Sequence, residues 1–135
     1  MSPRIPPRPD HASFPSAGSR PSGTQQPIPV DWRPRLAKIV AAFSEGDFAL
    51  RRGVEGVQPV AAATATQVRD YLEDYGATLA ALPEQSWETS VCCWSGHHWD
   101  VLVDLWTREE GRSDLVLHAR VSGSGHVVIQ AVYVP

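Results

Sequence analysis

The sequence predicts an α+β domain in which N-terminal helices pack on one face of a four-stranded antiparallel meander. Two observations lead to this prediction. Apolar residues recur with a helical period between residues 31 and 76, and with a period of two from residue 87 onward. The joins between the later segments are only two to four residues long, which favours successive antiparallel hairpins.

The first 29 residues differ in composition from the rest. Eight of the twelve prolines lie there, separated mostly by Ser, Arg, Gly and Gln. Such a segment cannot bury enough apolar surface to offset the entropy lost on ordering, so residues 1–29 are expected to be a disordered tail. Residues 30–135 are expected to form a single domain with one modest core.

Charge and hydropathy argue against several classes of function. Up to residue 29 the chain has three arginines and one aspartate, and beyond it nine basic and fourteen acidic residues, so the domain carries a net −5. A domain with this acidity offers no track for phosphates, and nucleic acid is not an expected partner. No apolar run is as long as a membrane span and no signal peptide opens the chain. A cytoplasmic protein without a membrane partner is therefore expected.

The first predicted helix begins at Asp31, taken as its N-cap, and ends before Gly46. Pro34 fits its first turn, where the missing N–H is no loss. The side chains at helical spacing, which should face the core, are Leu36, Ile39, Val40 and Phe43.

The second predicted helix begins at Thr64, with Gln67 completing a capping box, and ends at Gly76. Its buried stripe is expected to be Val68, Tyr71, Leu72 and Tyr75. The segment "TLAAL" at 78–82 is expected to add another helical turn before Pro83 stops it.

Strands are expected over 87–94, 97–106, 114–121 and 126–134. A two-residue Ser95–Gly96 turn would set Cys93 opposite His98. Matching apolar faces in the next pair would set His118 near Asp104, and a bulged loop around Gly111 would supply that register.

This pairing leaves one apolar face for the helices and one mixed face. The mixed face is the candidate binding site, and besides Cys93 it carries six candidate residues: His98, Asp100, Asp104, Trp106, His118 and Arg120. The chain has five tryptophans, and one or two are expected on this face or its rim, where a tryptophan beside charges can anchor a partner.

Cys93, His98 and Asp100 are residue types that bind transition metals or form a Cys–His nucleophile. The paired Cys-x-x-Cys and His-x-x-x-His spacings are absent, and open strands supply no obvious oxyanion hole. The favoured interpretation makes the thiols small hydrophobes and Asp104–His118 a cross-strand polar pair. We therefore predict no metal, no cofactor and no catalytic residue.

Four short motifs stand out: 70–76 (DYLEDYG), 98–100 (HWD), 103–107 (VDLWT) and 110–115 (EGRSDL). Through them, the chain from about residue 36 to 135 resembles a small uncharacterised bacterial domain family, a domain of unknown function. The resemblance implies no activity, catalytic residue or cofactor, and the Cys92–Cys93 pair is not part of its pattern. The helix-plus-meander order is also similar to cystatin-like and nuclear-transport-factor-like folds, which licenses no function by itself.

The leading hypothesis is a non-enzymatic interaction or regulatory module that binds another protein through the acidic, Trp-bearing sheet face or through the Glu110–Asp114 hairpin. An immunity-type or accessory role is one version of it. The alternative is a small-molecule pocket or an enzyme lined by His98, Asp100, Asp104 and His118, in which a histidine beside carboxylates acts as a base. The oligomeric state is left open.

Overall fold

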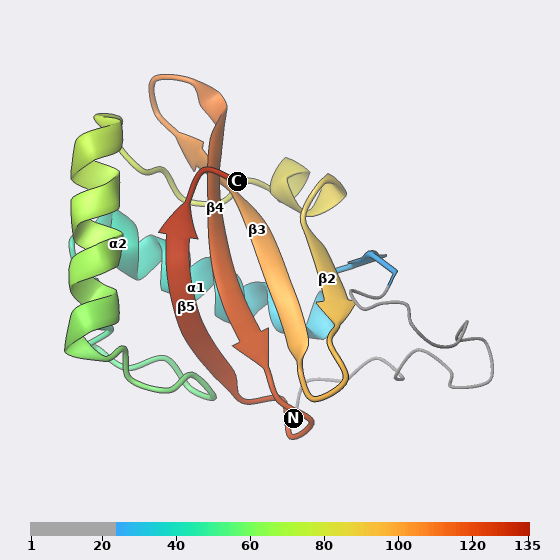
Figure 1. The fold of residues 1–135 in the computed structure, drawn as a ribbon. Coiled ribbons are helices and arrows are strands. Elements are labelled where there is room, and N and C mark those ends of the chain that lie inside the picture. The colour runs from blue at the N-terminus through green and yellow to red at the C-terminus, as the bar shows by residue number, and fades with distance from the viewer. Residues whose placement is uncertain (1–23) are drawn as a thin grey trace.

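The protein is described by a computed structural model that covers residues 24–135 (Figure 1). A single antiparallel sheet has the order β1-β2-β3-β4-β5, and α1 crosses behind it while α2 lies beside β5 (Figure 1). The strands are β1 (Gln26–Pro27), β2 (Val91–Trp94), β3 (Trp99–Thr107), β4 (Gly111–Val121) and β5 (Val127–Tyr133). The helices are α1 (Arg33–Ser44), α2 (Ala62–Tyr75) and the short 3₁₀ helices η2 (Val30–Trp32) and η3 (Glu84–Glu88). The α+β class is confirmed.

The sheet has five strands, and the prediction of four is wrong. The additional strand β1 comes from the stretch assigned to the tail: Gln26 pairs with Cys92, and Pro27 pairs with Val91. Ile28, directly after it, is fully buried. An average composition over 29 residues does not reveal a single buried isoleucine. Proline is tolerated in an edge strand, so the prolines of this stretch did not exclude β1. Residues 1–23 of the predicted tail lie outside the described part of the chain.

Helix α1 forms as its apolar period predicts, with Leu36, Ile39, Val40 and Phe43 buried. Pro34 lies in the first turn. Asp31 is not the N-cap, because the 3₁₀ turn η2 precedes the helix and places Trp32 at that position. Trp32 is itself almost fully buried and packs edge-on against Trp99, with ring centroids 6.2 Å apart.

Helix α2 begins at Ala62 with Ala61 as N-cap, so the predicted capping box at Thr64 is wrong. Gln67 instead points to the edge of the sheet, where its side-chain amide donates to the Val132 carbonyl at 2.7 Å and accepts from the Val132 N–H at 3.1 Å. The Tyr71 hydroxyl accepts from the next free N–H, that of Val134. The helix thus covers an edge that would otherwise be open to another strand.

The segment from 78 to 88 does not form the predicted helical turn and strand. Leu79 pairs antiparallel with Thr107, and the Ala80 N–H donates to the Trp106 carbonyl at 2.8 Å. Residues 84–88 then form η3, whose Ser86 hydroxyl donates to the Asp104 carbonyl at 2.7 Å. These segments replace a longer β2, which pairs with β3 only as far as Leu102.

Replacing Gln67 with leucine tests the edge contact. The substitution keeps the size of the side chain but leaves the Val132 N–H and carbonyl unpaired, so the free energy of unfolding should fall by about 1–3 kcal/mol. Urea unfolding followed by circular dichroism measures it. Gln58→Leu is the control, because Gln58 is exposed and should change stability by less than about 0.5 kcal/mol. Equal stability of the two variants would contradict the assignment.

Candidate functional site

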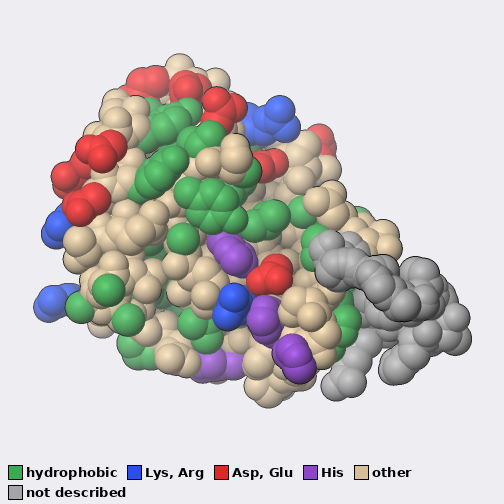
Figure 2. All heavy atoms as spheres, viewed as in Figure 1, with side chains coloured by type: hydrophobic (Ala, Val, Ile, Leu, Met, Phe, Trp, Pro, Cys, Tyr) green, Lys and Arg blue, Asp and Glu red, His purple; other side chains and the backbone are tan. Residues whose placement is uncertain are grey.

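The face of the sheet turned away from α1 is called here the open face (Figures 1 and 2). Figure 2 shows hydrophobic side chains across its middle and a group of His, Asp and Arg side chains below them. The residues that alternate onto this face include Val91, Cys93, Asp100, Leu102, Asp104, Trp106, Val116, His118, Arg120, Ala131 and Tyr133. All but one of the predicted candidates are therefore strand residues of this face; the exception is His98.

His98 lies in the loop between β2 and β3, because that loop has four residues and not two. Trp94 pairs with Trp99 and Cys93 with Asp100, a register shifted by two residues from the predicted one. The Ser95 N–H and hydroxyl both donate to the His98 carbonyl at 2.9 Å, which closes the wider loop. Because side chains alternate with a period of two, this shift preserves the faces while it changes the partners.

The pairing of β3 with β4 also preserves the predicted faces and changes the residues that lie opposite one another. His118 stands opposite Leu102, and Arg120 opposite Asp100, so the predicted pairing of His118 with Asp104 is wrong. The register does shift between Asp104 and Trp106, near the Gly111 turn where a bulge was predicted. Gly111 has a φ of +77°, a conformation that glycine adopts without strain.

Three nitrogen groups converge on one carboxylate oxygen, Oδ1 of Asp100. His118 Nε2 lies 2.9 Å from it in a hydrogen bond, His98 Nε2 lies at 3.4 Å and Arg120 Nε at 3.6 Å. We call these four residues the Asp100 cluster. The side chains of Asp100 and His118 are 32% and 22% exposed, so the cluster is partly buried and still reaches solvent.

Asp104 does not belong to this cluster. The Thr89 hydroxyl donates to its carboxylate, and its backbone N–H donates to the Ser90 hydroxyl at 2.9 Å. Asp104 therefore holds the connection between η3 and β2 against β3, and its role is structural.

Above the Asp100 cluster the open face is apolar except for Asp104, which lies between Leu102 and Trp106 on β3. Leu102, Trp106 and Tyr133 are partly buried there, and Val116 is only 6% exposed. Trp106 stands opposite Arg112, beside Gly111. The Tyr133 ring meets His118 edge-on at 6.3 Å, which joins this region to the cluster. We call it the apolar patch, and its members are Val91, Leu102, Trp106, Val116, Ala131 and Tyr133.

The two thiols lie on opposite faces, and neither is suited to nucleophilic chemistry. Cys92 is buried on the helix-covered face, where burial and the neighbouring Cys93 raise its pKa to about 12. Partial burial, with the Asp100 charge, also raises the pKa of Cys93 on the open face. The thiolate is the reactive form, so both residues are poor nucleophiles near neutral pH. Within residues 24–135, no group of three or more His, Cys, Asp or Glu side chains is placed to hold a metal ion.

The hairpin between β3 and β4 is held to the end of α2 by contacts that were not predicted from the sequence. We call the contacts of Glu109 with Thr78 and of Glu110 with Tyr75 the latch. Glu109 accepts from the N–H and the hydroxyl of Thr78 at 2.8 and 2.9 Å, and the Tyr75 hydroxyl donates to Glu110 at 2.9 Å. The hairpin is thereby tied to the end of α2. The motifs at 70–76 and 110–115 are distant in sequence and meet here, which is the signal that could have revealed the latch.

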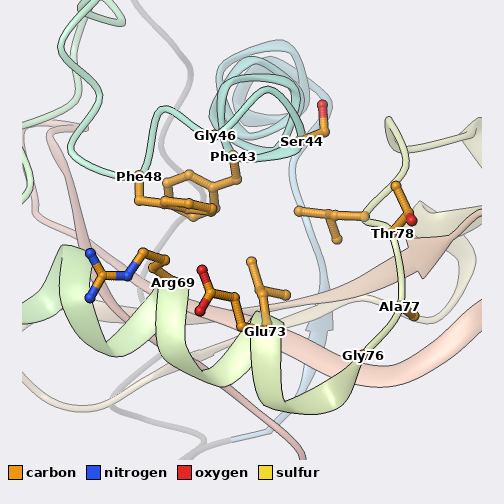
Figure 3. A pocket seen from close by; sticks show the side chains of 11 residues that line it. Phe43, Ser44, Gly46, Phe48, Arg69, Glu73, Gly76, Ala77 and Thr78 are labelled. Atoms are coloured by element: carbon orange, nitrogen blue, oxygen red, sulfur yellow. The ribbon is translucent and has the colours of Figure 1, made fainter.

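A pocket of about 330 Å³ lies between the end of α1, α2 and the segment that follows it (Figure 3). Phe43, Phe48 and Leu72 supply apolar lining, while Arg69 and Glu73 project from α2 beside them (Figure 3). None of the six predicted site residues lines it, so the pocket and the candidate site are separate features.

A family model described as a domain of unknown function (DUF7668) matches residues 40–135. The chain belongs to this family. The match covers the C-terminal part of α1, all of α2 and strands β2 to β5, and thus both the Asp100 cluster and the latch. No curated protein and no solved structure matches the chain. No helix among residues 24–135 has the length and apolar character needed to cross a membrane.

Thiol labelling tests the two cysteine environments. In the native DUF7668 domain at pH 7.5, Cys93 should react slowly with a disulfide reagent and Cys92 should stay unlabelled, because a raised pKa lowers the thiolate fraction at a given pH. Both should react rapidly in urea. Mass spectrometry of the labelled peptides assigns the sites, and rapid native labelling of Cys92 would contradict its burial.

The latch should depend on pH. Hydrogen bonds from Thr78 lower the pKa of Glu109, so its contribution to stability is complete above the ordinary value of 4.5 and is lost as the pH falls through the lowered value. Wild type should have a higher Tm than Glu109→Gln at pH 7, and the difference should narrow below pH 4.5. Glu55→Gln, at an exposed position, is the control and should leave the Tm unchanged. A Tm difference that is constant with pH would rule the latch out.

Proposed function

We propose that this domain is a non-enzymatic protein-interaction module whose docking surface is the apolar patch of the open face. The observation that carries the proposal is the chemistry of the exposed sheet surface. An antiparallel sheet with one solvated face normally alternates apolar and polar residues. Here β3 presents Leu102 and Trp106 to the solvent side, and β5 presents Tyr133. Helix α1 lies on the other face (Figure 1).

The make-up of the patch favours a protein partner. Contiguous exposed apolar surface on a soluble domain is typical of interaction sites. Aromatic side chains at the centre with charged side chains at the rim are the usual arrangement in protein interfaces. Trp106 and Tyr133 supply the aromatic anchors, and the Asp100 cluster and Arg112 supply the charges. A regulatory, accessory or immunity-type role in the bacterial cytoplasm would be exercised through this surface.

The alternative of a small-molecule pocket or enzyme has one observation in its favour, the hydrogen bond between His118 and Asp100, since such a pair can act as a general base. Three observations weigh against it. The nearest thiol, Cys93, has a raised pKa, and Asp104 is engaged by Thr89 away from the pair. The pocket of Figure 3 is lined by other residues. The interaction surface therefore has the stronger support.

Peptide selection tests the proposal. A phage-displayed library of random dodecapeptides is panned on the immobilised full chain, and enriched peptides are synthesised and titrated by biolayer interferometry. Leu102→Gln, at the centre of the patch, should weaken their binding about tenfold or more, as expected for a residue at the core of an interface. Circular dichroism and Tm confirm that the variant is folded.

Val30→Gln is the matched control, because Val30 is an aliphatic residue 68% exposed in η2, outside the open face. It should change peptide affinity less than twofold. Failure to enrich peptides, or equal affinity for wild type and Leu102→Gln, would refute the docking surface.

A further inference from the structure

Resting on this proposed function, we propose that the Asp100 cluster recognises a carboxylate on the partner, so that the partner segment is acidic beside the apolar residues that dock on the patch. The cluster, and not the patch, would then decide which partners bind. The occupant is an Asp or Glu side chain of another protein.

The first argument is an excess of donors. Nitrogens of His98, His118 and Arg120 all surround the single oxygen Oδ1 of Asp100. A carboxylate oxygen offers about two lone pairs, so it cannot satisfy three donor groups at short distance. Only His118, at 2.9 Å, reaches hydrogen-bonding distance, while the other two remain at 3.4 and 3.6 Å. Donor capacity is therefore left over for a second carboxylate.

Arg120 carries most of that excess. A guanidinium has five N–H donors in a planar fork that suits a carboxylate in bidentate fashion. Within residues 24–135 the Arg120 guanidinium has one ion pair, through Nε to Asp100 at 3.6 Å, and makes no hydrogen bond. Its side chain is 48% exposed on the open face. The fork is thus held on one side by Asp100 and is accessible from solvent.

The second argument is the position of the cluster relative to the patch. In the sheet, Leu102 forms a row with Val91 and His118, and Asp100 forms the next row on the same face with Arg120. Rows on one face are separated by two residues, or roughly 7 Å. An extended partner segment could therefore place an apolar side chain on Leu102 and, about two residues further along that segment, a carboxylate at Arg120.

The third argument is charge. The folded domain is acidic overall, with nine basic and fourteen acidic residues beyond residue 29, yet the cluster sets three nitrogen groups around one carboxylate. The N-terminal tail is a poor occupant because its three arginines and single aspartate give it the same sign as Arg120. A partner with a negative charge gains binding free energy at this one point of the face. Charges at the rim of an interface select partners in this way.

The dodecapeptide selection decides the matter when it is extended to charge variants. Peptides whose binding depends on Leu102 should be enriched in Asp or Glu one to three positions from an aromatic or aliphatic residue. Replacing that acid by its amide should weaken binding to wild type about tenfold, the effect expected of a charge-assisted bidentate contact. Arg120→Glu should weaken the acidic peptide similarly and make the amide substitution almost neutral.

Lys38→Glu is the control charge reversal, since Lys38 is an exposed residue of α1, which lies on the other side of the sheet (Figure 1). It should leave affinity within about twofold. Arg120→Gln serves in place of Arg120→Glu if the charge reversal lowers the Tm. Leu102-dependent peptides without acidic enrichment, or insensitive to both Arg120 variants, would overturn this inference and leave the proposed function standing. A selection with no Leu102-dependent peptide would overturn both.

A second copy of the chain is the remaining occupant to test. Sedimentation velocity of the full chain between 5 and 200 µM should show a single monomeric species for wild type and for Arg120→Glu. Concentration-dependent dimerisation abolished by Arg120→Glu would assign the cluster to self-association and overturn the assignment to a separate partner.

Discussion

The backbone of β3 is the constraint on which the rest of this fold depends. The strand is fully buried on one face at Trp99, Val101, Val103 and Leu105, so its N–H and carbonyl groups must be paired along its whole length. Strand β4 pairs one edge, but β2 has only four residues and covers the other edge as far as Leu102. Beyond that point, Ser86 and Ser90 bind the backbone of Asp104, and Ala80 and Thr78 bind Trp106 and Arg108.

Short segments take the place of a strand along part of β3, and Asp104 and Asp100 therefore have different contacts. Asp104 lies where η3 crosses the edge, so its carboxylate and backbone are occupied by Thr89 and Ser90. Asp100 lies where β2 provides an ordinary strand neighbour, and its side chain stays on the open face with His118 and Arg120. Two aspartates four residues apart on one face thus have different surroundings: Asp104 holds the segment after η3 against β3, and Asp100 stays partly exposed beside His118 and Arg120.

The outer edge of β5 is covered, which supports the proposal that a partner binds the open face. The side chains of Gln67 and Tyr71 occupy the outer edge of β5 near its end, and the backbone N–H of Gln58 donates to the Val127 carbonyl near its beginning. An exposed edge is the usual route to strand addition, and covering it removes that route. The open face itself carries partly buried aromatic and aliphatic side chains bordered by charges.

The sequence by itself determined the class of the fold, the core stripe of α1, and which residues share a face of the sheet. These follow from periods of 3.6 and 2.0 residues, and an error of two residues in register leaves them intact, as the β2–β3 and β3–β4 pairs show. The alternation therefore placed Asp100, His118 and Arg120 on one face, but the predicted register set His118 near Asp104 and not beside Asp100.

Only the tertiary structure decided which residues lie opposite one another in the sheet and which distant segments are in contact. Register depends on loop length and bulges, and the four-residue loop at 95–98 replaced the predicted two-residue turn. The same limit hid β1, the latch of Glu109 on Thr78, and the use of Gln67 as an edge cap, because each joins segments at least 31 residues apart. Such contacts arise from unpaired backbone groups that the fold leaves open, and no local pattern in the chain records which groups those are.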